Sequence, residues 1–185
     1  MLGRFPEHYF PVALFEHAKA LDIPRNTDVL DVRIVSSRQK LVQIFDNLVA
    51  GLNMDTASRR FQRNTYYLKS TLSKLLLLPA IYVQARDGNG VFKRDSFELA
   101  RRDFADQDWS VIRLASQLRH EWTVNVGPIA RRLMVQPAWR GKISQRRLAP
   151  PLTHRMHSLV GGSFPTDVSN LVAKMHQQLL PLRGI

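Results

Sequence analysis

One apolar stripe constrains the fold more than any other feature of this 185-residue chain. Between residues 41 and 52, apolar side chains recur at the intervals of one helix face: Leu41, Val42, Phe45, Leu48, Val49 and Leu52. This period predicts an amphipathic helix that buries one side. We expect Ser36 or Ser37 to cap its start, and Gly51 with Asn53 to end it.

Helical spacing recurs in most of the remaining sequence. Further helices are predicted at about residues 10–21, 55–78, 95–104, 108–127 and 163–179. Asp55 or Thr56 is expected to cap the second of these, and Pro79 to end or kink it, because proline lacks an amide donor. Residues 80–93 could complete that helix or form a hairpin at Asp87-Gly88-Asn89-Gly90, and we favour a loop between helices.

Residues 29–35 differ from these helices, because apolar and charged side chains alternate there as they do in a strand. The predicted fold is therefore mainly α, a multi-helix bundle with one or two short strands near the N-terminal side. A basic irregular segment precedes the last helix. We expect residues 1–128 to form a helical body with the strand at about 29–35. Residues 129–185 add the basic segment and the C-terminal helix, packed on the same domain.

The net charge of +12 is distributed unevenly along the chain. Residues 1–121 hold 18 basic and 14 acidic side chains, whereas residues 122–185 hold 9 basic side chains and one acid, Asp167. No acid occurs between Trp122 and Thr166. Seven cations lie in the acid-free stretch: Arg131, Arg132, Arg140, Lys142, Arg146, Arg147 and Arg155. Such a stretch attracts polyanions, of which nucleic acid is the commonest in cells.

Trp139 lies among these cations and adds a ring on which a base could stack. The combination favours binding of RNA through its phosphates. No recognition-helix, zinc-finger or RNA-recognition signature accompanies it, so we expect little base specificity. An acidic protein surface would suit the same residues. A structural subunit of a larger assembly is the remaining alternative. The sequence leaves the oligomeric state open.

Several kinds of site are not expected. The chain has no cysteine, which excludes disulfides and cysteine nucleophiles. Its six histidines show no metal-ligand spacing, so neither a metal nor another cofactor is predicted. The longest apolar run, Leu75 to Val83, is too short to cross a bilayer, and the first residues lack an apolar signal core. We therefore expect no membrane association and a cytoplasmic protein.

Arg113 and His120 are seven residues apart, so they project from the same face of the predicted helix. An Arg followed six residues later by His resembles the motif of the HEPN nucleases, which are helical bundles. The resemblance implies that Arg113 polarises a scissile RNA phosphate and that His120 positions or moves a proton. Alternatively, the two residues only flank the apolar stripe of their helix.

A second resemblance covers about residues 29–122. A strand ending in DVRIVS, an amphipathic helix, an Arg-rich stretch before Tyr66 and Tyr67, and Phe92-Lys93-Arg94-Asp95 follow one another. This order is similar to the last core strand and helical C-terminal region of nucleotidyltransferase-superfamily proteins. The resemblance implies that Lys93 contacts a nucleotide phosphate and that Asp31 matches a metal-side carboxylate.

The catalytic motif of that superfamily is incomplete in this chain. The motif requires a Gly-Ser turn followed by two carboxylates that hold Mg²⁺. Gly161-Gly162-Ser163 is followed by Asp167 alone. We therefore expect a binding protein rather than an enzyme. A nucleotidyltransferase-like or HEPN-like domain acting on nucleotides or RNA is kept as the alternative.

Overall fold

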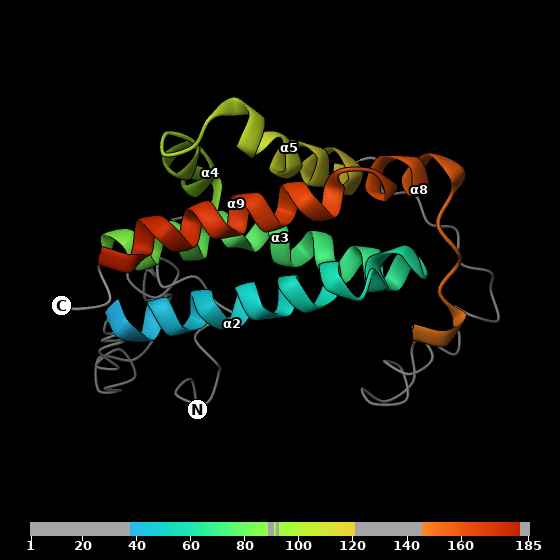
Figure 1. The fold of residues 1–185 in the computed structure, drawn as a ribbon, viewed down its shortest axis with the longest axis horizontal. Helices are drawn as coiled ribbons and strands as arrows, with labels where there is room; N and C mark the ends of the chain where they lie inside the picture. Colours follow the sequence, from blue (N-terminus) through green and yellow to red (C-terminus); the bar gives the residue numbers. More distant parts are fainter. Residues whose placement is uncertain (1–37, 89–90, 92, 121–145, 182–185) are drawn as a thin grey trace, which may run out of the picture. The chain divides into compact units, whose positions relative to one another are not determined.

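A computed structural model describes residues 38–88, 91, 93–120 and 146–181 (Figure 1). Within these ranges the chain is mainly α-helical, which confirms the mainly α part of the predicted class, and the predicted short strands are not seen there. The elements in order are α2 (Arg38–Ala57), the 3₁₀ helix η4 (Arg60–Gln62), α3 (Thr65–Asp87), α4 (Lys93–Arg101), α5 (Asp106–His120), α8 (His154–Gly161) and α9 (Phe164–Leu179). The predicted helix at 10–21, strand at 29–35 and boundary at 128 lie outside the described residues.

The chain divides into two compact units, each assembled from separate stretches of sequence. Unit 1 comprises residues 1–48, 77–105 and 174–185. Unit 2 comprises residues 49–76 and 106–173. Each unit is built from helices around its own buried apolar side chains.

Tyr82 of α3 is the largest fully buried side chain of unit 1. Its ring lies 6.4 Å from that of Phe45 on α2 and 5.3 Å from that of Phe104, which follows α4. The Tyr82 hydroxyl donates a hydrogen bond of 2.7 Å to Asp103 Oδ2, so the polar end of this buried ring is satisfied.

In unit 2, a pair of buried rings fixes η4. Phe61 of η4 and Phe164 of α9 pack edge to face with their centroids 5.4 Å apart, and α8 packs against η4.

The stripe predicted for α5 is buried at Trp109, Ile112, Ala115 and Leu118. The stripe predicted for the last helix is buried throughout: Val168, Leu171, Val172, Met175 and Leu179.

The predicted end of α2 is wrong. The helix continues beyond Gly51 and Asn53 to Ala57, so Asp55 and Thr56 lie inside it and do not cap the next helix. A glycine in a helix costs only about 1 kcal/mol, and burial of the Leu52 side chain in the same turn offsets that cost. The Thr56 hydroxyl also donates to Leu52 O at 3.1 Å, which keeps this polar group within the helix.

Pro79 does not end α3, which continues to Asp87. Proline removes one backbone hydrogen bond, but the following turn is almost completely buried, including Tyr82 and Val83. Packing therefore outweighs the local signal, and the alternative of a strand at 80–85 is wrong. Despite the apolar character of α3, no described helix combines the length and hydropathy needed to cross a membrane.

Two other boundaries differ from the sequence-based predictions. α4 begins at Lys93 rather than at Asp95 or Ser96. α8 lies directly after the predicted irregular segment, and no helix was predicted there. Thr153 caps α8 by accepting a hydrogen bond of 3.2 Å from the Met156 amide. The described end of the basic segment, residues 146–148, forms a short helical turn.

Candidate nucleic-acid interface

The described end of the basic segment is fixed to the first turn of α3 by hydrogen bonds within unit 2. Asn64 Nδ2 donates to the carbonyl oxygen of Arg146 at 2.9 Å. The Pro150 carbonyl accepts from both the amide and the hydroxyl of Thr65, at 2.9 and 3.1 Å. Segments that are far apart in the sequence are thus held together by hydrogen bonds to the main-chain carbonyls of Arg146 and Pro150.

Asn64 also determines where α3 begins. Its side-chain oxygen accepts a hydrogen bond of 3.2 Å from the Tyr67 amide, the contact expected of a helix N-cap. Thr65 is the first residue of the helix and is buried. Tyr66 and Tyr67 follow it in the first turn and are half-buried.

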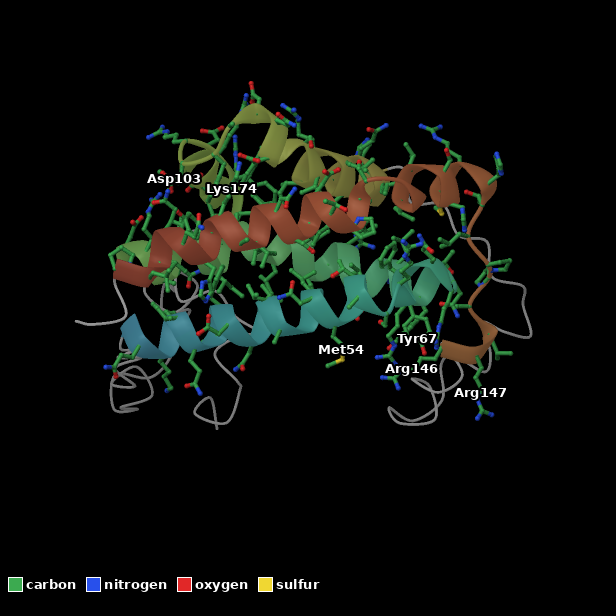
Figure 2. The ribbon with its side chains drawn as sticks, in the orientation of Figure 1. Met54, Tyr67, Asp103, Arg146, Arg147 and Lys174 are labelled. Carbon is green, nitrogen blue, oxygen red and sulfur yellow. The ribbon has the colours of Figure 1, made fainter. Side chains whose placement is uncertain are left out.

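Two arginines lie over these two tyrosines. The Arg60 guanidinium is 5.4 Å from the centroid of the Tyr67 ring, and that of Arg146 is 5.9 Å from the centroid of the Tyr66 ring. Both distances are within the range of cation–π contacts. We call these four residues the Arg–Tyr cluster; Tyr67 and Arg146 are labelled in Figure 2.

The tyrosines of the Arg–Tyr cluster change the pKa of Arg146. Interaction with the Tyr66 side chain, and more weakly the charge of the Tyr67 side chain, raises the pKa of Arg146 above its ordinary value. Three further arginines of unit 2 are exposed next to the cluster in sequence: Arg59, Arg63 and Arg147. We call these three with Arg60 and Arg146 the basic surface. No ion pair among the described residues joins an acid to the basic surface.

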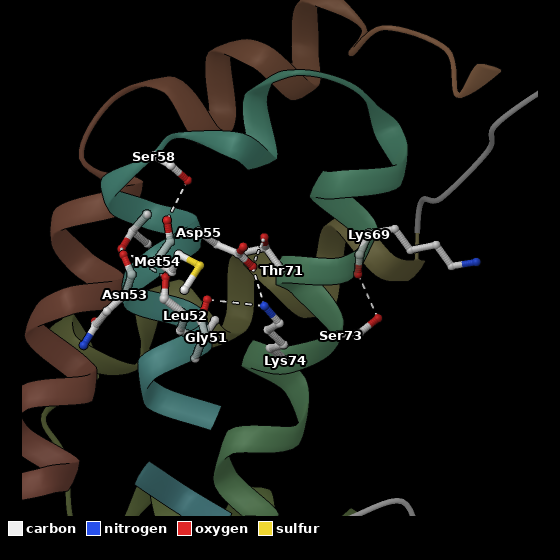
Figure 3. A network of polar contacts seen from close by, with 11 residues as sticks. Gly51, Leu52, Asn53, Met54, Asp55, Ser58, Lys69, Thr71, Ser73 and Lys74 are labelled. Atoms are coloured by element: carbon white, nitrogen blue, oxygen red, sulfur yellow. Dashed lines mark hydrogen bonds and ion pairs between the residues drawn. The ribbon is translucent and has the colours of Figure 1, made fainter. Parts of the chain in front are cut away.

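The one acid of residues 49–76, Asp55, is occupied elsewhere (Figure 3). Its Oδ2 atom accepts a hydrogen bond of 3.0 Å from the Thr71 hydroxyl and lies 2.7 Å from Lys74 Nζ. Lys74 also donates to Gly51 O at 3.3 Å, an approach that the missing side chain of Gly51 permits. This network leaves the arginines at residues 59–63 without a counterion from their own segment.

The two residues of the HEPN-like motif are not brought together within α5. Arg113 Nη2 donates to Asp106 O at 3.0 Å, and Nη1 lies 3.5 Å from Asp106 Oδ1. Asp106 begins α5, so the guanidinium extends toward the start of the helix. His120 is exposed at the other end.

The remaining predicted site residues are placed as follows. Arg155 is exposed in the first turn of α8, and Lys93 is the first residue of α4. The side chain of Lys93 lies outside the description, as do the following residues: Asp31, Arg131, Arg132, Trp139, Arg140 and Lys142.

Sequence reasoning noticed Tyr66 and Tyr67 only for their place in the nucleotidyltransferase-like order and did not include them in the basic interface. A signal that could have found them is a second acid-free stretch. Residues 56–86 contain six basic side chains and no carboxylate. The signal used at residues 122–166 is therefore present here as well.

In the described ranges, no three His, Asp or Glu side chains gather closely enough to hold a metal ion. Comparisons with protein-family models, with curated proteins and with solved structures found no match to this chain. The resemblances to HEPN nucleases and nucleotidyltransferases thus stay predictions, and the site is interpreted from its own chemistry.

Proposed function

We propose that this protein is a nucleic-acid-binding module that binds RNA, mostly through phosphate contacts and with little base specificity. The observation that supports this most strongly is the docking of residues 146–150 on the start of α3. This docking joins Arg146 and Arg147, from the predicted basic stretch, to Arg59, Arg60 and Arg63 in one acid-poor surface.

The chemistry of this basic surface suits phosphate groups. A guanidinium donates two parallel hydrogen bonds to a phosphate, which a lysine ammonium does not. Arg60 and Arg146 also lie over tyrosines in the first turn of α3, at the positive end of the helix, and this turn has no acid. Cations at a helix N-terminus are unfavourable, and a bound polyanion offsets that repulsion.

The backbone at Arg59 supports a functional role as well. Its φ angle of 47° lies in the left-handed region, which favours glycine over side chains with a Cβ atom. An arginine at this position costs folding free energy relative to glycine, although its amide donates to Thr56 O at 3.1 Å and its carbonyl accepts from the Gln62 amide at 3.0 Å. Such strain is frequent at binding sites.

The test is the salt dependence of RNA binding by the full chain. Fluorescence anisotropy would follow a labelled strand of about 20 nucleotides, longer than the sites of single-strand-binding folds. If the five arginines each contact one phosphate, log K falls with log salt with a slope of about −3.5. Binding that is unchanged between low and high salt would contradict the proposal.

A matched pair of variants separates the basic surface from net charge. Arg63→Gln with Arg147→Gln removes two exposed arginines of unit 2, and Arg94→Gln with Arg102→Gln removes two exposed arginines of unit 1. We expect the first pair to lower RNA affinity about tenfold and reduce the slope by about 1.4. The second pair is expected to have a much smaller effect. Equal losses would assign the binding to net charge alone.

Polyglutamate serves as the competitor in the same assay. RNA is expected to be displaced poorly by polyglutamate, because binding to the closely spaced phosphates of a nucleic acid releases condensed counterions, which favours binding. Displacement as efficient as that by unlabelled RNA would indicate an acidic protein partner instead.

A further inference from the structure

Two tyrosine rings remain partly at the surface in the first turn of α3. Tyr66 and Tyr67 are consecutive, their centroids are 5.5 Å apart and their planes are nearly perpendicular, at 85°. This edge-to-face contact holds each ring against the other. The rings are therefore fixed in orientation before any ligand arrives.

Each ring carries a guanidinium on one face, contributed by Arg60 or Arg146. A guanidinium stacked on a ring still has its N–H groups around its edge and a second planar face. Unpaired bases stack both on aromatic rings and on arginine planes. A tyrosine with its arginine can thus extend a stack with a base while the arginine edge donates to the adjoining phosphate.

Phosphate contacts alone explain Arg59, Arg63 and Arg147, but they give no role to the rings. Bases within a duplex are already stacked on each other and are not available to a surface ring. Bases of a single strand are available. The rings therefore distinguish between the two forms of nucleic acid, which the charges do not.

We propose that the Arg–Tyr cluster binds unpaired nucleobases by stacking, so that the ligand is single-stranded. This inference rests on the proposed nucleic-acid binding. It assigns the discrimination of single strands from duplex to Arg60, Tyr66, Tyr67 and Arg146.

The decisive experiment compares three DNA ligands of equal length with the full chain: a thymidine strand, a strand whose sugars carry no bases, and a duplex. The first two have the same phosphates and differ only in the bases. We expect the thymidine strand to bind about tenfold more tightly than the abasic strand, as stacking of one or two bases produces. The duplex is expected to bind no better than the abasic strand.

Substitution of the rings localises the effect. In Tyr66→Leu with Tyr67→Leu, affinity for the thymidine strand is expected to fall to that for the abasic strand, while affinity for the abasic strand stays unchanged. Tyr66→Phe with Tyr67→Phe keeps the rings and is expected to retain the preference. Thermal unfolding of each variant checks that α3 remains folded.

The outcomes separate the two proposals. Equal binding of thymidine and abasic strands by the unmodified protein, or tighter binding of the duplex, would overturn base stacking and leave phosphate binding intact. That comparison needs no variant, so it holds even if the leucine variants unfold. Absence of binding to all three ligands and to the labelled RNA strand would overturn the proposed function itself.

Discussion

Near each end of α3 a tyrosine of the helix has an arginine over its ring, and the two pairs have different surroundings. In unit 2, Arg60 lies 5.4 Å from the centroid of Tyr67; in unit 1, Arg86 lies 5.8 Å from that of Tyr82. Arg86 is also paired with two carboxylates: Asp103, and Asp87 at 2.6 Å. Tyr82 is fully buried, whereas Tyr67 is half-buried and Arg60 has no carboxylate among the described residues.

The comparison teaches that an Arg–Tyr stack does not by itself mark a binding site. Near the end of α3, the carboxylates neutralise the cation and burial hides the ring, so the pair stabilises the fold. At the start of α3, the same contact has no carboxylate partner in the described part of the chain, and its ring is partly accessible. The absence of nearby acids therefore distinguishes the candidate site from the structural pair.

The largest difference is expected in stability. Tyr82→Ala removes a fully buried ring and is expected to lower the free energy of unfolding by about 3–5 kcal/mol. Tyr67→Ala removes a half-buried ring and is expected to cost about 1 kcal/mol. Urea unfolding measures both values. Similar losses would mean that the two tyrosines have the same structural role.

The second prediction removes a carboxylate from the structural pair. Asp103→Asn weakens contacts with Arg86 and with the Tyr82 hydroxyl, and is expected to cost about 1–2 kcal/mol, because the site is only partly screened by solvent. It also raises the net charge by one. If the basic surface alone binds RNA, affinity is expected to change by less than about twofold, since Asp103 belongs to unit 1 and salt screens the single added charge. A marked rise in affinity would contradict the distinction between the two pairs.

The helical part of this fold could be predicted because apolar spacing is a local property. The stripe at Leu41–Leu52 and the stripe of α9 are buried as predicted, apart from the half-buried Leu48. The wrong boundaries at Gly51 and Pro79 share one cause. At Gly51 and Pro79 the local signal to stop costs about 1–3 kcal/mol, and burial of the neighbouring turns exceeds that cost.

The candidate site was predictable in its charge but not in its composition. A lack of acids indicated Arg146 and Arg147 as part of a basic stretch, and both are exposed in the structure. Their neighbours Arg60, Tyr66 and Tyr67 depend on the hydrogen bond from Asn64 to Arg146 O, which no local pattern encodes. For Arg113, helical spacing suggested pairing with His120, but Asp106 at the start of α5 attracts the guanidinium instead.

The third prediction uses pH to detect the buried tyrosine. Burial, and then the hydrogen bond and charge of Asp103, raise the pKa of Tyr82 above its ordinary value of about 10. A raised pKa means that the unfolded state loses its proton first. The contribution of protonated Tyr82 to the stability of the folded state is therefore complete below about pH 10. It is lost as the pH rises through that value toward the pKa of Tyr82 in the folded state.

Tyr82→Phe removes this titration. The unmodified protein is expected to lose stability above pH 10 more steeply than the variant, by up to about 1.4 kcal/mol per pH unit. Urea unfolding at a series of alkaline pH values provides the measurement. Parallel pH profiles for the two proteins would show that Tyr82 ionises as readily when folded as when unfolded.

The smallest effect concerns Arg59, where stability and binding are expected to change in opposite directions. Arg59→Gly removes the steric penalty of a left-handed backbone, and it is expected to stabilise the protein by about 0.5–1 kcal/mol. The relief of this penalty in the folded state exceeds the cost of the greater conformational entropy that glycine gives to the unfolded state. It also removes one phosphate contact, so RNA affinity is expected to fall a few-fold and the salt slope by about 0.7.

Arg59→Ala is the matched control, because it loses the same charge without relieving the backbone. A gain in stability for glycine only, with equal losses of affinity in both variants, would show that arginine is retained at this position for its charge. Unchanged affinity in both variants would instead remove Arg59 from the basic surface and leave RNA binding to its other four arginines.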